Sequence, residues 1–136
     1  MTKQIKLLID ICMVILLILL FITEDILSIH IFLGYFIIPV IIIHLLLNGK
    51  WLVNSTKKLF SGKLTTPKLR YMYVLFVGLT IAFAVCIISG IAIVEYSAGH
   101  LCDLHEISAY ACVVLVILHV QVHWRYLKSF LPSKAA

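Results

Sequence analysis

The chain has 136 residues, of which 63% are hydrophobic and 12% are charged, and its formal net charge is +5. Its mean hydropathy of +1.15 is too high for a soluble domain, because so short a chain cannot bury that much apolar surface. The composition therefore excludes an ordinary soluble enzyme and indicates a membrane protein.

Four apolar stretches are long enough, or nearly so, to cross about 30 Å of hydrocarbon as helices. They comprise residues 5–22, 29–47, 71–94 and 104–122. We expect the first to be a retained helix and not a cleaved signal, because no A-x-A-like site follows it. The predicted fold is all-α, a polytopic four-helix transmembrane bundle that forms a single domain over residues 1–136.

All eleven lysines and arginines fall on one side of the membrane if the four spans alternate in direction. The other side holds acidic residues, namely Glu24, Asp25, Glu95, Asp103 and Glu106. By the positive-inside rule, both termini and the loop of residues 48–70 are cytoplasmic. The positive charge then faces the headgroups of the lipid bilayer and does not indicate a nucleic-acid site. Residues 51–60 mix aromatic and apolar residues with two lysines, and we expect them to continue the second span along the membrane surface.

The second predicted span aligns with the fourth when the chain is shifted against itself. The shift that matches His30 with His105 also matches His44 with His119. The alignment depends mainly on these histidines, because apolar residues coincide by chance in any two membrane spans. Both spans run from the outside to the inside, so the sequence predicts a parallel repeat of two helical hairpins.

The paired histidines have the same spacing in both spans, since His30 and His44 are as far apart as His105 and His119. Over this spacing of fourteen positions, an α-helix rises ~21 Å and returns to within ~40° of its starting direction. Each helix thus presents two imidazoles on one face. We expect His30 to be level with His105 and His44 with His119. Two facing imidazoles at each of two depths are what bis-histidine ligation of two stacked haems requires.

The histidines also have simpler interpretations. A single histidine in a membrane helix is equally well explained by a hydrogen bond to a neighbour or by the interface. Zinc and copper also accept imidazole, but their sites bring the ligands to one point. Metal-ion or proton transport through the histidines is the main alternative function, and a membrane-anchor subunit for a redox partner is another.

Several motifs accompany the histidines. Asn48 and Trp51 follow His44, ISGI occupies residues 88–91, and LHEISAY and ILHVQVHWRYL lie in the last span and its continuation. With these motifs the chain resembles, over nearly its whole length, the flavinylation-associated cytochromes, which are small four-helix b-type cytochromes of bacterial cytoplasmic membranes. The chain departs from the family pattern at one position, because the acidic residue after the outer histidine is Glu106 in one repeat but Ile31 in the other. We therefore expect the surroundings of the two haems to differ.

The resemblance implies a cofactor and a function. It implies two haem b groups and electron transfer across the membrane, from quinol or a cytoplasmic-side donor to an acceptor outside, such as a flavin-carrying protein. No residue set predicts bond-making chemistry of the protein's own, so whether it is an enzyme or an electron-transfer subunit stays open. The implied iron ligands are His30, His44, His105 and His119.

Accessory residues have two or more interpretations each. His123 follows His119 by four residues and would hold a haem propionate, mark the interface or replace His119 as the ligand. Gly90 either clears room for a macrocycle, as Gly34 would, or packs two helices closely. Arg125 either neutralises a propionate or anchors the inner face.

One acidic residue falls within the first span. Asp10 lies four residues after Lys6, and we expect the two to form an ion pair at the interface. A role of Asp10 in proton or quinone binding is the alternative interpretation.

Overall fold

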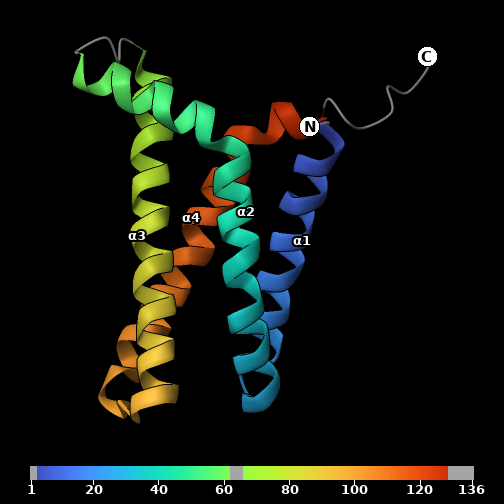
Figure 1. Cartoon of the computed structure of the whole chain (residues 1–136), viewed down its shortest axis with the longest axis vertical. Coiled ribbons are helices and arrows are strands. Elements are labelled where there is room, and N and C mark those ends of the chain that lie inside the picture. Colours follow the sequence, from blue (N-terminus) through green and yellow to red (C-terminus); the bar gives the residue numbers. More distant parts are fainter. Residues whose placement is uncertain (1–2, 62–65, 129–136) are drawn as a thin grey trace. The chain divides into compact units, whose positions relative to one another are not determined.

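The computed structural model describes residues 3–61 and 66–128, with side chains described for residues 4–61 and 66–124 (Figure 1). Helices make up 93% of this structure, and the two described ranges contain no strand. Four of the helices are long and apolar enough to cross a membrane. The chain is therefore an all-α, multi-pass membrane protein, as its composition predicts. The helices are α1 (Lys3–Ile22), α2 (Leu27–Phe60), α3 (Pro67–Tyr96), the short 3-10 helix η1 (Gly99–Leu101) and α4 (Cys102–Lys128).

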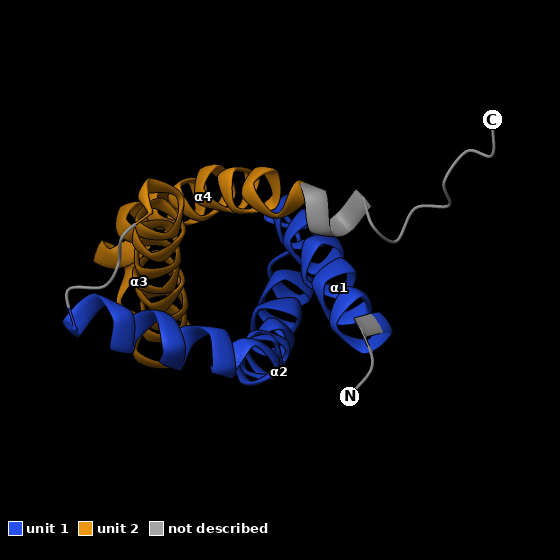
Figure 2. Ribbon diagram, turned by 90° about the horizontal axis from the view of Figure 1, so that it is seen from above, with its two compact units in different colours: residues 1–63 blue, residues 64–136 orange. Residues whose placement is uncertain are grey.

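The helices form two compact units, Met1–Lys63 and Leu64–Ala136 (Figure 2). The first unit is a hairpin of α1 and α2, and the second is a hairpin of α3 and α4. Helix α2 begins at Leu27 and helix α4 at Cys102. The shift that matches the histidines also matches these two starts, although the repeat itself stays a prediction, as does the single domain.

The first hairpin closes through a short turn after Ile22. The backbone nitrogen of Thr23 donates to the carbonyl oxygen of Leu19 over 3.0 Å, and the Thr23 hydroxyl donates to the same oxygen over 2.7 Å. These bonds satisfy a carbonyl group that has no partner within the helix. Further along the hairpin from the turn, Leu16 of α1 packs with Ile37 and Val40 of α2 to form the buried core of this unit.

The second hairpin has clear boundaries. Helix α3 begins with Pro67, a residue whose missing N–H is not needed at the first helical position. It ends at Tyr96, and the next residue, Ser97, has a left-handed backbone with φ 53° and ψ 34°. Leu75 of α3 and Cys112 of α4 are buried in this unit, together with the hydroxyl-bearing residues Ser89 and Ser108.

Many large apolar side chains of the two hairpins are exposed. Leu46 is 74% exposed, Val74 68%, and Ile107 67%. Such large apolar surfaces are stable only where hydrocarbon replaces water, and helices satisfy their backbone groups internally. The exposed apolar surface therefore belongs in the lipid bilayer.

Helix α2 is longer than its predicted membrane span. Its 34 residues correspond to ~51 Å, whereas the hydrocarbon core is ~30 Å thick. Figure 1 shows the green end of α2 turning aside from the rest of the helix. Residues 51–60 thus continue the second span as a helix, as predicted. On a helical projection Lys50, Asn54 and Lys57 share one side, and Leu52 and Leu59 lie on the opposite side, so this segment is amphipathic.

Candidate functional site

His30 lies in the first turn of α2 and contacts the end of α1 within the same hairpin. Its Nδ1 is 3.0 Å from the carbonyl oxygen of Leu20, which belongs to the last turn of α1, where carbonyl groups lack an intrahelical donor. A carbonyl oxygen only accepts hydrogen bonds, so Nδ1 donates and Nε2 carries the lone pair of the ring. The short turn between the helices makes this contact, because it places their ends side by side.

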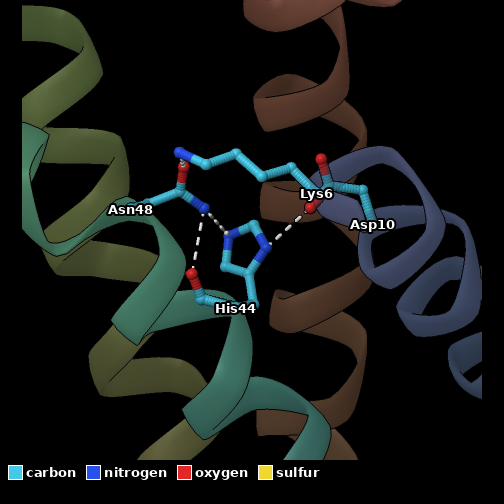
Figure 3. Close-up of polar contacts among 4 residues, drawn as sticks. All are labelled: Lys6, Asp10, His44 and Asn48. Carbon is cyan, nitrogen blue, oxygen red and sulfur yellow. Dashed lines mark hydrogen bonds and ion pairs between the residues drawn. The ribbon is translucent and has the colours of Figure 1, made fainter. Parts of the chain in front are cut away.

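His44 lies about four turns further along α2, and its ring also faces α1 (Figure 3). Its Nδ1 is 2.7 Å from Oδ1 of Asp10, and the side chains of His44 and Asp10 are 21% and 29% exposed. A carboxylate oxygen accepts from the ring N–H, so Nε2 is again the nitrogen with the lone pair. Asn48, one turn beyond, donates from Nδ2 to the His44 carbonyl oxygen over 2.9 Å and lies 3.5 Å from Nε2.

The expected ion pair of Lys6 and Asp10 is replaced by contacts across the hairpin (Figure 3). Lys6 donates to Oδ1 of Asn48 over 3.4 Å, whereas Asp10 accepts from His44. Lys6 and Asp10 are four residues apart on α1, and His44 and Asn48 are four residues apart on α2. In an antiparallel hairpin these two pairs face each other, so each polar group of α1 finds its partner on α2.

His105 lies in the first turn of α4 and packs against α3. Its Nδ1 is 2.9 Å from the carbonyl oxygen of Cys86 and 3.3 Å from the hydroxyl oxygen of Ser89. The carbonyl oxygen requires a donor, so here too Nδ1 carries the hydrogen and Nε2 the lone pair. Ser89 is 2% exposed and donates to the carbonyl oxygen of Val85 over 2.7 Å, which satisfies its buried hydroxyl group.

Gly90 allows the His105 ring to approach α3. A Cβ atom at Gly90 would lie 2.9 Å from Cε1 and 3.2 Å from Nδ1 of His105. Glycine is therefore the residue that fits at this point of the helix interface. The structure gives Gly90 the close-packing role, and a role beside a macrocycle stays a prediction. At Gly34, by contrast, no described atom outside the adjoining backbone of α2 lies within 4 Å of where a Cβ would stand.

His119 and His123 lie one turn apart on α4. Their ring centroids are 4.6 Å apart and their planes are inclined by 40°, so the two imidazoles share one face of the helix. This proximity leaves both as candidate ligands of one metal-binding position. Arg125 belongs to α4, but its side chain lies outside the described residues.

Three of the four predicted ligands share one chemical form. His30, His44 and His105 each hold Nδ1–H on an oxygen of the neighbouring helix in their own hairpin. Histidines that ligate a metal through Nε2 characteristically donate the other ring N–H to a carboxylate or a backbone carbonyl. These three histidines therefore fit the ligands that haem iron would need, because the hydrogen bond of each Nδ1 sets the tautomer and the orientation of the ring.

A metal centre with converging ligands is not formed by the described residues. They contain no group of three or more histidine, cysteine, aspartate or glutamate side chains that would hold a metal ion. Zinc sites in proteins use three or four such ligands around one point. Paired imidazoles that bind opposite faces of a macrocycle do not need such a group.

Sequence reasoning identifies the histidines but misses their partners. It pairs Asp10 with Lys6, and it points to neither the carbonyl oxygen of Cys86 nor the hydroxyl group of Ser89. The sequence does contain a signal for Asp10. In an antiparallel hairpin, the residue numbers of two facing residues add up to nearly the same value for every facing pair. Lys6 with Asn48 and Asp10 with His44 obey this relation.

No family model, no curated protein and no solved structure matches the chain. The resemblance to the flavinylation-associated cytochromes therefore stays a prediction from the sequence motifs.

Proposed function

We propose that this protein is a dihaem b-type cytochrome that carries electrons across the bacterial cytoplasmic membrane. The observation that supports it most is the common form of His30, His44 and His105, in which Nδ1 donates to an oxygen and Nε2 is the basic nitrogen. Three histidines with the same arrangement, at the predicted positions, favour ligation.

The residues take separate roles in this proposal. His30 and His105 would hold the outer haem, and His44 and His119 would hold the inner haem, with His123 as the alternative inner ligand. Bound haem b supplies a one-electron ferric–ferrous couple. The protein chain holds the imidazoles, excludes water from the apolar segments around them and sets the basicity of each Nε2 through its hydrogen-bond partner.

The charge distribution supports the direction of insertion. Both termini lie in the cytoplasm, and Arg125 is placed on that side, where a guanidinium group would neutralise a haem propionate. The electron donor is quinol or a cytoplasmic-side reductant. The acceptor lies outside, and a flavin-carrying protein is the candidate that the sequence motifs suggest.

Haem content of the purified full-length chain tests the proposal. We expect two haem b per chain by the pyridine haemochromogen assay and a sharp reduced α-band typical of six-coordinate low-spin iron. His30→Ala and His44→Ala are each expected to retain one haem, because each removes a ligand at a different level. His100→Ala is the matched control, since His100 is exposed in η1 and belongs to neither level.

Three results would contradict the proposal or narrow it. Protein without a Soret band excludes the cytochrome function. Retention of both haems by His30→Ala removes that residue from the ligand set. One haem in the unaltered chain favours the anchor-subunit alternative.

Proton transport is the second candidate, and the contact of Asp10 with His44 favours it. An ionisable pair inside an apolar segment is a common feature of proton pathways. Proteoliposomes loaded with a pH-sensitive dye test this function. Acidification that occurs without haem and is lost in Asp10→Asn would support transport over electron transfer.

A further inference from the structure

The hydrogen-bond partners of the histidines differ between the two predicted levels. At the outer level, His30 and His105 both donate to main-chain carbonyl oxygens, those of Leu20 and Cys86. The other neighbours of the His105 Nδ1 are the Ser89 hydroxyl at 3.3 Å and the Cys86 sulfur at 3.8 Å, and neither is a carboxylate. At the inner level, His44 donates to a carboxylate oxygen of Asp10 over the shorter distance of 2.7 Å. A carboxylate is a stronger acceptor than a neutral carbonyl group, and hydrogen bonds to ionised acceptors are shorter and roughly twice as strong.

The neighbouring polar groups keep Asp10 directed toward His44. Lys6 donates to Asn48, and Asn48 in turn donates to the His44 carbonyl oxygen, so these two side chains are engaged with each other and with α2 (Figure 3). Asp10 projects from α1 beside the ring, and both side chains are more than two-thirds buried. The carboxylate therefore acts on the imidazole with little competition from water.

We infer that Asp10 is a positioning residue that orients His44 and makes its Nε2 more basic, so that the inner haem has a lower reduction potential than the outer one. The inference rests on the proposed function. A more basic axial nitrogen and a nearby negative charge both stabilise ferric over ferrous iron, because the ferric form carries one more positive charge. At the outer level the neutral carbonyl acceptors exert this effect less.

The difference gives electron transfer a direction. An electron shared between two sites resides mainly on the one with the higher potential. With the carboxylate at the cytoplasmic level, that site is the outer haem, from which an extracytoplasmic acceptor would be reduced. Asp10 thereby favours flow from the inside to the outside.

Redox titration of the purified, haem-loaded full-length chain tests the inference. Asp10→Asn has nearly the same shape as aspartate but no charge, and Asp10→Glu keeps the charge. Loss of a hydrogen-bond partner of a metal-ligating histidine changes metal affinity by about 10- to 100-fold. We expect Asp10→Asn to change the ferric-to-ferrous ratio of one haem by about tenfold, which raises its midpoint potential by ~59 mV for a one-electron couple.

Three comparisons identify the source of the shift. The haem whose midpoint potential shifts in Asp10→Asn must be the haem that is missing from His44→Ala. The other haem must keep its potential. Asp10→Glu is expected to stay closer to the unaltered protein. Asp25→Asn removes an exposed carboxylate at the tip of the same hairpin and is expected to leave both potentials unchanged.

The outcomes separate this inference from the proposed function. Two bound haems with unchanged potentials in Asp10→Asn overturn the role of Asp10 and leave the cytochrome function standing. A chain that binds no haem overturns both. If Asp10→Asn loses the inner haem, its retention in Asp10→Glu supports the role of the carboxylate, and its loss from both variants overturns the effect on potential in favour of simple packing.

Discussion

Substitution of Gly90 by alanine tests the packing of His105 against α3. The added Cβ would stand 2.9 Å from Cε1 and 3.2 Å from Nδ1 of the His105 ring, and real Cβ contacts are rarely so short. The ring is a rigid plane held over 2.9 Å to the carbonyl oxygen of Cys86. It must therefore move as a whole, and its hydrogen bond lengthens as it moves.

The expected cost follows from three opposing effects. Overpacking of a well-filled interface costs about 1 to 3 kcal/mol. Weakening of the hydrogen bond costs about 0.5 to 1.5 kcal/mol. Replacement of glycine by alanine within a helix stabilises the helix by about 1 kcal/mol. We expect Gly90→Ala to lower the free energy of unfolding of the second hairpin by about 0.5 to 3.5 kcal/mol.

Gly78→Ala is the matched control on the same helix. Its Cβ would lie 3.9 Å from Cδ1 of Leu115, an ordinary van der Waals distance. This variant keeps the gain in helix propensity without the steric cost, so it should be as stable as the unaltered chain or about 1 kcal/mol more stable. Unfolding by dodecyl sulfate in mixed micelles, followed by circular dichroism, measures both. Equal stability of Gly90→Ala and Gly78→Ala would refute the argument.

Three further predictions concern other parts of the chain. Ser97→Gly should raise the midpoint of thermal unfolding, because a left-handed backbone costs a non-glycine residue about 1 kcal/mol; Ser28→Gly, inside α2, should lower it. Gly34→Leu should reduce haem content under the proposed function without unfolding the hairpin, since no described atom outside the adjoining backbone of α2 lies within 4 Å of its Cβ position; unchanged haem content would place the macrocycle elsewhere. Reversal of Lys57 and Lys58 to glutamate should reduce hydrogen-exchange protection of residues 51–60 in anionic but not zwitterionic nanodiscs, because each lysine near an anionic surface contributes about 1 kcal/mol.

Hydropathy predicts the helices well because the solvent imposes them. Each apolar stretch must satisfy its backbone groups without water, and the helix is the structure that does so within one segment. The ends of the helices are less predictable from hydropathy alone. Helix α2 continues through Gly49 to Phe60, since no proline interrupts it there and its amphipathic pattern persists, whereas the apolar run ends at Leu47.

The contacts of the histidines are harder to predict than their positions. Spacing along a helix determines which side chains share a face, and it places His30 and His44 together. The partner of each ring depends on how two helices pack, and a backbone carbonyl such as that of Cys86 leaves no mark in the sequence. Proximity along the chain pairs Asp10 with Lys6, although its actual partner lies on the facing helix.

The difference between backbone and side-chain acceptors has a consequence for how the two levels can change. A carbonyl oxygen stays in place whatever residue carries it, so substitution at Leu20 keeps the acceptor of His30, provided that the helices keep their packing. His105 also donates to a carbonyl oxygen, but its Nδ1 has two side-chain neighbours as well, the Ser89 hydroxyl at 3.3 Å and the Cys86 sulfur at 3.8 Å. Asp10 is a side chain, and one base change can remove its charge. The hairpins therefore set the tautomers of these three rings before any cofactor arrives, which reduces the ordering cost of binding. Under the proposed function, the charge of the His44 acceptor depends on the side chain of Asp10, so substitution at this position would adjust the driving force of electron transfer.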